Sequence, residues 1–573
     1  MPDGLERPTP RSMATTALGE VSLADVRDAI DRDETVPAWK RAQWKSALKR
    51  LGEFLGRDLA AMPARLRALQ PALRGLHHAQ LGITKARLRN IKSDLRAALG
   101  HCGHIIPGLG KDQELAPAWM ALHDRLTEVR HRRGLIRFFR FCSFRGIGPE
   151  DVDDDAVTAF LEAVIESGSV TKPKNLHRSV CRFWNDCVEN IAGWPRCPVT
   201  VPDNRPARKT LSWDAFTDAL RSDVAAHLDW LAGKDLLAED GPARPCKPAT
   251  LERRREYIRL AASAAVASGI DIKALNSLAD LVRPETVKRI LDVYLARYDD
   301  EPTTFIIDLA ERLRDIARRW TDLPKTEIAA LDRMCRRLGK HRRLGMTDKN
   351  LAVIRKVRDP AEWAELMALP ERLMDEAMAA RNALHKAAIK AQMALAIRLL
   401  SVAPMRIANL ASLSLETNVI QTGGLEGRYH LAIPDHDVKN GVPLEYPLPE
   451  SVSDMLALYI SMFRNRVKGS NTEWLFPGEN GHKDPKTLSG QIKDIIAKEI
   501  GLKITPQQFR HAAAAILLKA HPGNYELVRR VLGHKSLQTT INFYIGLENW
   551  DAAQQYAKLV LNEPDDDDAD QID

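Results

Sequence analysis

The amino-acid sequence predicts a mainly α-helical protein with a small antiparallel β-sheet in the C-terminal part of the chain. Three observations lead to this fold class. Alanine and leucine recur throughout, whereas aromatic residues make up only 6% of the 573 residues, which favours helices over strands. Apolar residues follow helical spacing in most segments. Convincing extended segments are found only beyond residue 348.

The size and charge of the chain indicate several domains and a polyanionic partner. At roughly 150 residues per domain, the length predicts about three or four domains. The formal net charge is +8, but seven acidic side chains lie in the last eleven residues, so the rest of the chain carries +15. This excess of positive charge is typical of proteins that bind nucleic acid, although a basic surface that serves only solubility would explain it as well. We expect the acidic end, 563–573, to be a disordered tail.

Membrane insertion, secretion and a zinc site have little support. No stretch approaches about 18 uninterrupted apolar residues, and the polar, proline-rich N-terminus lacks the apolar core of a signal peptide. Seven cysteines without a CxxC pair indicate reduced thiols, so we expect a cytoplasmic protein. Cys102 and His104 are separated by one residue, but no second pair completes a tetrahedral zinc site.

The first 113 residues are expected to form an extension of short amphipathic helices. Ser22 and Asp25 have the pattern of a capping box before an apolar run. Pro37 fits the first turn of a second helix. The segment from Thr84 to Leu99 predicts a basic helix, which taken alone is most simply a solvated helix face.

Two helical blocks follow, at 114–205 and 206–345. A stretch rich in proline and charge, from Cys197 to Lys209, predicts the linker between them. In the first block arginines alternate with phenylalanines, and the periodicity places the phenylalanines mainly in the core. Each block has an apolar helix, a Gly-Ile turn (Gly146-Ile147 and Gly269-Ile270) and a second amphipathic helix. This shared plan indicates either a diverged repeat or a coincidence.

The predicted strands lie in a C-terminal domain that we expect to span 346–562. Arg428 to Ile433 and Pro443 to Leu448 alternate apolar and polar residues on either side of Lys439-Asn440-Gly441. An Asn-Gly pair between two alternating runs is a strong hairpin signal. The remaining C-terminal elements are expected to be helical up to Leu561.

Two basic residues in this domain are candidates for chemistry. An apolar helix ends at Pro404, and Arg406 then opens the next helix, where it can bind an oxyanion beside free backbone N–H groups. Lys439 lies at the predicted hairpin turn, and a lysine on a rigid tip can act as a general acid. Taken singly, each of them is better explained as an ordinary solvated side chain.

Two further motifs lie closer to the C-terminus. Thr505, Pro506 and Gln508 fit the start of a helix, so Arg510 faces the positive end of its dipole, which is unfavourable unless an anion lies nearby. The run from Leu532 to Tyr544 predicts a helix end at its glycine and a new helix after it. Periodicity alone favours a half-buried core position for Tyr544.

In this order and spacing, these features resemble the catalytic domain of the tyrosine recombinases, also called the phage-integrase family. The family's pattern is an arginine after an apolar helix, a hairpin lysine, a His-x-x-Arg box, a Leu-Gly-His and a tyrosine nine or ten residues later. The matching positions are Arg406, Lys439, Gln507 with Arg510, His534 and Tyr544. The resemblance covers about Asp348 to Leu561, and the two upstream blocks resemble the family's core-binding modules, the second of the SAM-like kind.

The resemblance implies DNA strand breakage and rejoining without a metal or other cofactor. Arg406 and Arg510 would clamp the scissile phosphate, with hydrogen bonds from His534 and, more weakly, Gln507. Tyr544 would attack to give a 3′-phosphotyrosyl link, while Lys439 would protonate the leaving 5′-hydroxyl.

The resemblance also implies partners and a biological setting. These are double-stranded DNA with specific recombination sites and a tetramer of this chain, alone or with related recombinases. The setting would be integration or transposition of a mobile element in the bacterial cytoplasm, at the nucleoid. The amphipathic segment Asn549 to Leu561 would dock on a neighbouring protomer, as in the family, or pack on its own domain.

Two positions depart from the family's pattern. Gln507 replaces the histidine of the His-x-x-Arg box, and an amide cannot exchange a proton at neutral pH. Asn409 stands where the family usually has an acidic residue, which weakens any ion pair orienting the basic groups. His511 follows Arg510 directly, but helix geometry turns it about 100° away, so we do not expect it to replace Gln507. A DNA-binding accessory protein with weakened or lost cleavage therefore remains an alternative.

A metal-dependent nuclease is a third hypothesis. It would use Asp151 and the three acids Asp153 to Asp155. Acidic residues at a helix N-terminus are stabilised by the helix dipole without any metal, and the sequence has no second carboxylate cluster in a folded region. The recombinase hypothesis therefore ranks first.

Overall fold

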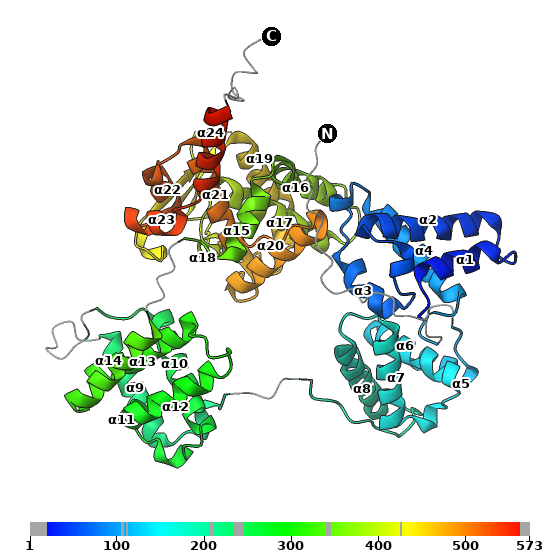
Figure 1. Ribbon diagram of the computed structural model, residues 1–573, viewed down its shortest axis with the longest axis horizontal. Helices are drawn as coiled ribbons and strands as arrows, with labels where there is room; N and C mark the ends of the chain where they lie inside the picture. Colours follow the sequence, from blue (N-terminus) through cyan, green and yellow to red (C-terminus); the bar gives the residue numbers. More distant parts are fainter. Residues whose placement is uncertain are drawn as a thin grey trace, which may run out of the picture. The chain divides into compact units, whose positions relative to one another are not determined.

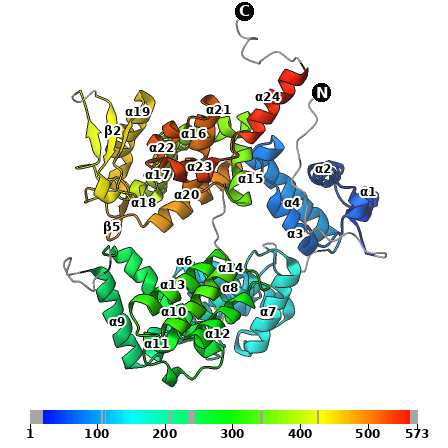
Figure 2. The same cartoon turned by 60° about the vertical axis from the view of Figure 1, so that its left-hand side comes forward.

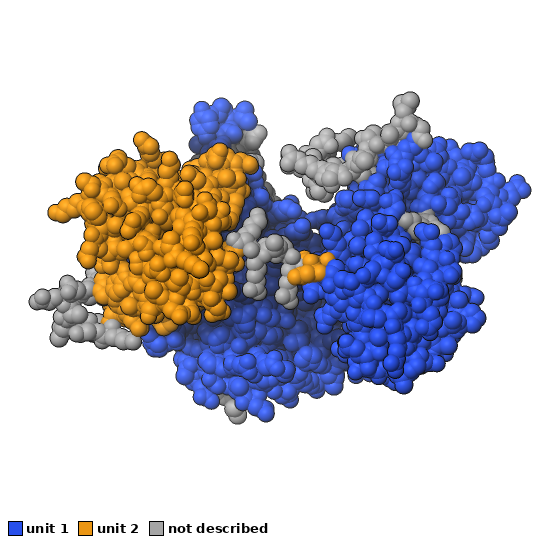
Figure 3. Space-filling view, turned by 90° about the horizontal axis from the view of Figure 1, so that it is seen from below, with its two compact units in different colours: residues 1–202, 344–573 blue, residues 203–343 orange. Residues whose placement is uncertain are grey.

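The computed structural model confirms the fold class, which is mostly helical with small antiparallel sheets (Figure 1). It describes residues 20–104, 108–110, 113–204, 210–233, 242, 244–339, 345–423 and 427–561. The chain divides into two compact units, Met1–Pro202 with Leu344–Asp573, and Asp203–Arg343 (Figure 3). The buried apolar residues form four separate cores, within 23–99, 109–199, 216–331 and 346–547. No helix among the described residues is long and apolar enough to cross a membrane.

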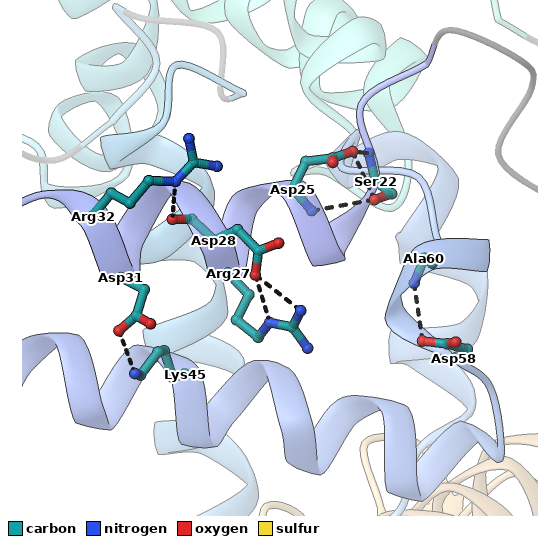
Figure 4. Close-up of polar contacts among 9 residues, drawn as sticks. All are labelled: Ser22, Asp25, Arg27, Asp28, Asp31, Arg32, Lys45, Asp58 and Ala60. Carbon is teal, nitrogen blue, oxygen red and sulfur yellow. Dashed lines mark hydrogen bonds and ion pairs between the residues drawn. The ribbon is translucent and has the colours of Figure 1, made fainter.

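The first core is built from four helices and two short 3-10 turns. The capping box is confirmed: the Asp25 amide donates to Ser22 Oγ at 3.2 Å, and the Ser22 amide donates to Asp25 Oδ2 at 2.8 Å (Figure 4). Thr84 caps the basic helix, as its sequence predicts. Pro37 stands one position earlier than expected, as the N-cap. The elements are α1 (Leu23–Arg32), α2 (Ala38–Leu55), η1 (Leu59–Ala61), α3 (Leu66–Gly75), η2 (Ala79–Leu81) and α4 (Lys85–His101).

The second core confirms that the phenylalanines are mainly internal. Phe138, Phe139 and Phe141 are buried, whereas Phe144 is 45% exposed at the end of its helix. The acids considered for a nuclease site bind backbone N–H groups, with Asp151 accepting from Gly148 and Asp153 from Ala156. The elements are α5 (Pro117–Arg125), α6 (Val129–Arg145), η3 (Pro149–Asp151), α7 (Asp154–Ser167) and α8 (Pro173–Asn190).

The third core belongs to the second unit, and one of its helices is followed by the same kind of Gly-Ile turn as a helix of the second core. In both, a helix ends at a glycine with positive φ, and the following isoleucine amide donates to the carbonyl five residues back: Ile147 to Cys142 at 3.0 Å, Ile270 to Ala265 at 3.2 Å. The plan then diverges, because the second unit inserts α11. Its elements are η4 (Trp213–Ala215), α9 (Asp218–Ala232), α10 (Pro248–Ala267), η5 (Ile272–Ala274), α11 (Leu278–Leu281), α12 (Pro284–Leu295), α13 (Thr304–Arg319) and α14 (Lys325–Leu338).

The fourth core is arranged around α17 (Leu384–Val402), an apolar helix that contacts helices on several sides (Figure 1). The sheet lies at one end of this domain, beside α19 (Figure 2). The other helical elements are α15 (Asp348–Val357), α16 (Pro360–Met378), α18 (Ile407–Ala411), α19 (Glu450–Leu458), η8 (Tyr459–Phe463), η9 (Arg464–Arg466), α20 (Pro485–Ile500), α21 (Pro506–Ala520), α22 (Tyr525–Leu532), α23 (Leu537–Tyr544) and α24 (Asn549–Leu561). The predicted acidic tail lies outside the described residues.

The predicted strands pair as expected, and the predicted turn at Lys439-Asn440-Gly441 is present, with the Gly441 amide donating to the Val438 carbonyl at 3.0 Å. The pairing runs from His430 with Pro447 to Ile433 with Leu444, and a ten-residue connection, 434–443, joins the strands. Val438, the first residue of this turn, is fully buried in the fourth core. The strands are β1 (Val419–Gln421), β2 (Tyr429–Ile433), β3 (Leu444–Pro447), β4 (Pro477–Gly478) and β5 (Gly481–His482), and the connection contains η7 (Asp435–Asp437).

Candidate active site

Arg510 links two turns of the chain that are far apart in sequence. The capping box predicted at Thr505 and Gln508 is present, so α21 begins at the proline and Arg510 lies just beyond its first turn. The side chain is 1% exposed. Its guanidinium donates to the carbonyl of Pro404 at 2.6 Å and to that of Leu532 at 2.7 Å. The arginine therefore joins the turn before α18 to the end of α22.

Arg406 lies at the start of α18, close enough to Arg510 for the two charges to repel. Burial and, to a smaller extent, the charge of Arg406 lower the pKa of Arg510 to about 10. Arg406 is half-buried, and its Nη1 is buried without a hydrogen-bond partner. The phenols of Tyr446 and Tyr544 lie near both guanidiniums. Two neighbouring guanidiniums that are partly removed from water, one of them with an unpaired N–H group, are suited to binding an anion.

His534 is placed by a left-handed glycine that ends α22. Gly533 adopts φ 60°, and the His534 amide returns to the carbonyl of Arg529 at 3.0 Å. The buried ring is hydrogen-bonded through Nδ1 to Oγ1 of Thr540, which is itself fully buried, at 2.9 Å. Burial and, to a smaller extent, the charges of the two site arginines lower the pKa of His534 to about 4. His534 is therefore neutral at pH 7.

Tyr544 ends α23 with its phenol inside the same cluster. The residue is 2% exposed, and its ring lies parallel to that of His534 with centroids 6.2 Å apart. Burial raises the pKa of Tyr544 to about 12, against the opposing effect of Arg510 and Arg406. The structure therefore brings four of the six site residues together, and Tyr544 is more deeply buried than periodicity alone indicates.

Lys439 and Gln507 are both exposed. The backbone around Lys439 is nevertheless anchored at two points: Asn409 Nδ2 donates to the Asp437 carbonyl at 3.1 Å, and Asn440 Nδ2 donates to the Gly533 carbonyl at 3.2 Å. These bonds hold the 434–443 connection against α18 and the turn that carries His534. Asn409 thus has a role that an acidic side chain could not fill, because it donates to a carbonyl.

His511, which the sequence did not place among the site residues, lies beside Tyr544. Its ring packs edge-on against Tyr544, and its Nδ1 lies 3.2 Å from the tyrosine Oη. The 100° rotation from Arg510 is correct, but α23 approaches α21 on the side that this rotation reaches. Gln507, three residues before Arg510, faces solvent instead.

Sequence reasoning missed two other residues of the cluster. Tyr446 lies on β3 with its hydroxyl donating to the Val531 carbonyl at 3.0 Å, and burial raises its pKa to about 12. The alternation of Leu444 and Tyr446 along the strand is a signal that could have placed it inward. Thr540, the partner of His534, has no comparable signal, because a threonine in a helix is more often solvated.

Comparison with known proteins identifies this domain. Residues 370–549 match the model of the phage integrase family. This segment belongs to that family. A Pseudomonas aeruginosa protein named as a tyrosine recombinase, XerC, is 35% identical over 66 residues, which are 11% of this chain and 16% of that relative. The phage integrase domain contains all six of the predicted site residues and the 434–443 connection.

Solved structures resemble the chain at low sequence identity. One is a λ integrase (75–356) dimer bound to a COC′ core site, with 16% identity over 56% of this chain and 93% of that one, and a TM-score of 0.33. Another is the XerH site-specific recombinase bound to its difH substrate, with 14% identity over 65% and 93% of the two chains, and a TM-score of 0.34. The family assignment rests on the 370–549 match rather than on these two likenesses.

Proposed function

We propose that the protein is a site-specific DNA recombinase that cuts and rejoins strands through a 3′-phosphotyrosyl intermediate. The observation that carries this proposal is the placement of the Tyr544 phenol beside two desolvated arginines and a neutral histidine, inside a phage integrase domain. The arginines supply positive charge where a phosphodiester gains negative charge in its transition state. No bound nucleotide or metal is needed for this chemistry.

The reaction keeps the energy of the broken bond. The Tyr544 oxygen forms a bond to phosphorus as the bond from phosphorus to the 5′-oxygen breaks. The phenol loses its proton to water, and Lys439 protonates the leaving 5′-oxygen. A 5′-hydroxyl from a second strand reverses these steps and joins the new ends. Because Tyr544 is 2% exposed, the site has to open for the phosphate to reach its oxygen.

The partners are duplex DNA with specific recombination sites and further copies of this chain. We assign 1–113 to an N-terminal extension, 114–205 and 206–345 to core-binding modules, 346–562 to the catalytic domain and 563–573 to the tail. In α24, the side chains of Tyr556, Leu559 and Val560 are 70%, 78% and 63% exposed. This exposure favours docking on a neighbouring protomer, in a tetramer, over packing on the same domain. Trp550 of the predicted apolar face lies outside the described side chains.

The biological role follows from the same chemistry. The protein serves integration or transposition of a mobile element, and it acts on DNA in the bacterial cytoplasm. A second candidate is a DNA-binding accessory protein that does not cleave. Two observations favour it: Gln507 replaces the histidine of the family's box and faces solvent, and the nucleophile is buried.

Covalent capture of nicked DNA separates the two candidates. Nicked duplexes from the DNA flanking the gene trap the intermediate, and wild type, Tyr544→Phe and Gln507→His are compared in EDTA on a denaturing gel. We expect an adduct in wild type that is absent in Tyr544→Phe. An adduct with Gln507→His alone supports the accessory role. No adduct from any of the three, on DNA that they bind, refutes the recombinase, and loss of the wild-type adduct in EDTA supports a metal-dependent reaction.

A further inference from the structure

A continuous chain of polar side chains leads from the start of α21 to the oxygen of Tyr544. The amide of Thr505 donates to Gln508 Oε1 at 2.8 Å, and Gln508 Nε2 donates to Asn350 Oδ1 of α15 at 3.2 Å. Asn350 Nδ2 lies 3.3 Å from Nε2 of His511, and Nδ1 of His511 lies 3.2 Å from Tyr544 Oη. Gln508 and His511 are buried, and Asn350 between them is partly buried.

One backbone group determines the direction of every hydrogen bond in this chain. The N–H of Thr505 can only donate, so Gln508 must present its oxygen there and its NH2 group to Asn350. Asn350 then accepts with its oxygen and presents its own NH2 group to His511. A proton on Nε2 of His511 would face that NH2 group, so Nε2 accepts.

The remaining ring nitrogen of His511 therefore carries the proton. Burial and, to a smaller extent, the charge of Arg510 lower the pKa of His511 to about 4, so the ring is neutral at pH 7 and holds a single N–H. With Nε2 accepting, this N–H is on Nδ1, the atom that faces Tyr544. A histidine in this tautomer donates to the phenol oxygen and has no lone pair with which to take the phenol proton.

We propose that His511 is a hydrogen-bond donor to the nucleophile oxygen, held in that tautomer by Asn350 and Gln508, and that it is not the general base. The proposal rests on the proposed recombinase function. During attack the phenol proton leaves to water, His511 keeps its own proton, and the Nδ1–H bond stabilises the negative charge that develops on Tyr544 Oη. The same bond orients the phenol while α23 is docked on α21.

Two isosteric substitutions distinguish a donor from a base. In His511→Asn the amide nitrogen can occupy the place of Nδ1 and donate, but it cannot take a proton. In His511→Asp the carboxylate can take a proton but cannot donate. Cleavage of nicked duplex is measured at saturating DNA, with DNA affinity and melting temperature measured on the same samples.

We expect His511→Asn to cleave within about fivefold of wild type, and His511→Asp to be slower by about ten- to a hundredfold, because a hydrogen bond to a charged oxygen is lost. DNA affinity should be unchanged in both. The reverse order of rates overturns the proposal, and so do equal rates in all three proteins. If neither variant folds, Asn350→Ala takes their place. This variant removes the amide that fixes the proton of His511 on Nδ1, so it should slow cleavage without weakening DNA binding. An unchanged cleavage rate in Asn350→Ala overturns the proposal.

The hydrogen bond can also be tested without activity. Tyr544→Phe should lower the melting temperature less in a His511→Ala background than in wild type, because only wild type has the bond to lose. Absence of this coupling overturns the proposal whatever the enzyme does. If the two substitutions are coupled in melting temperature but wild type forms no covalent adduct, the hydrogen bond between His511 and Tyr544 exists and the proposed recombinase function is refuted.

Discussion

Arg510→Lys tests whether this arginine holds the site together. The substitution keeps the positive charge, but an ammonium group cannot reach both the Pro404 and the Leu532 carbonyls, which the guanidinium bridges with bonds of 2.6 and 2.7 Å. One buried carbonyl is left without its donor, at a cost of about 1–3 kcal/mol. For a domain of this size, about 2–4 °C of melting temperature is lost per kcal/mol, so we expect a decrease of roughly 2–12 °C.

The assay is thermal unfolding with covalent capture of nicked DNA on the same samples. Capture should fall by at least about a hundredfold, since a donor to the transition-state phosphate is displaced. Arg530→Lys is the matched control, because Arg530 is exposed and pairs with Glu526 at the surface, and neither readout should change. An unchanged melting temperature in Arg510→Lys would refute the claim that this side chain joins the two turns.

Further predictions concern the groups around Arg510. Asn409→Asp replaces the donor to the Asp437 carbonyl by an acceptor, and should lower the melting temperature and slow DNA capture; equal values in both assays would contradict the anchoring role. His511 and His534 have pKa values lowered to about 4 in the fold, so the unfolded chain binds protons first as pH falls. The stabilising contribution of these two neutral histidines should therefore be fully present above about pH 6.5 and be lost as the pH falls towards 4. Melting temperatures measured over this pH range should decrease in the same way, and a constant melting temperature would contradict the lowered pKa values. Thr540→Val leaves the buried His534 Nδ1 without its partner and should cost about 1–3 kcal/mol in urea unfolding.

Several helix ends were predicted correctly because the rules for them depend only on short stretches of sequence. The capping boxes at Ser22 and Thr505 and the helix stop at Gly533 were predicted because the residues that form each of them are close neighbours in the chain. The order and spacing of motifs also located the four site residues that the structure brings together.

Features set by distant contacts could not be predicted from local stretches of sequence. The turn at Asn440 is local and was predicted, whereas the burial of Val438 beside it depends on the distant residues of the core. The position of His511 depends on which side of α21 receives α23, and no spacing within α21 carries that information. The role of Asn409 depends in the same way on a carbonyl 28 residues away.

The two anchors of the 434–443 connection affect the entropy of catalysis. Ordering ten residues of free loop at the moment of DNA binding would cost on the order of 10–20 kcal/mol. Here the backbone on both sides of Lys439 is already fixed by Asn409 and Asn440 when the domain folds. Only the lysine side chain remains to be ordered over the leaving oxygen, which costs about 2 kcal/mol. Only the Lys439 side chain is thus left to be ordered, because the backbone that carries it is already fixed before the DNA binds.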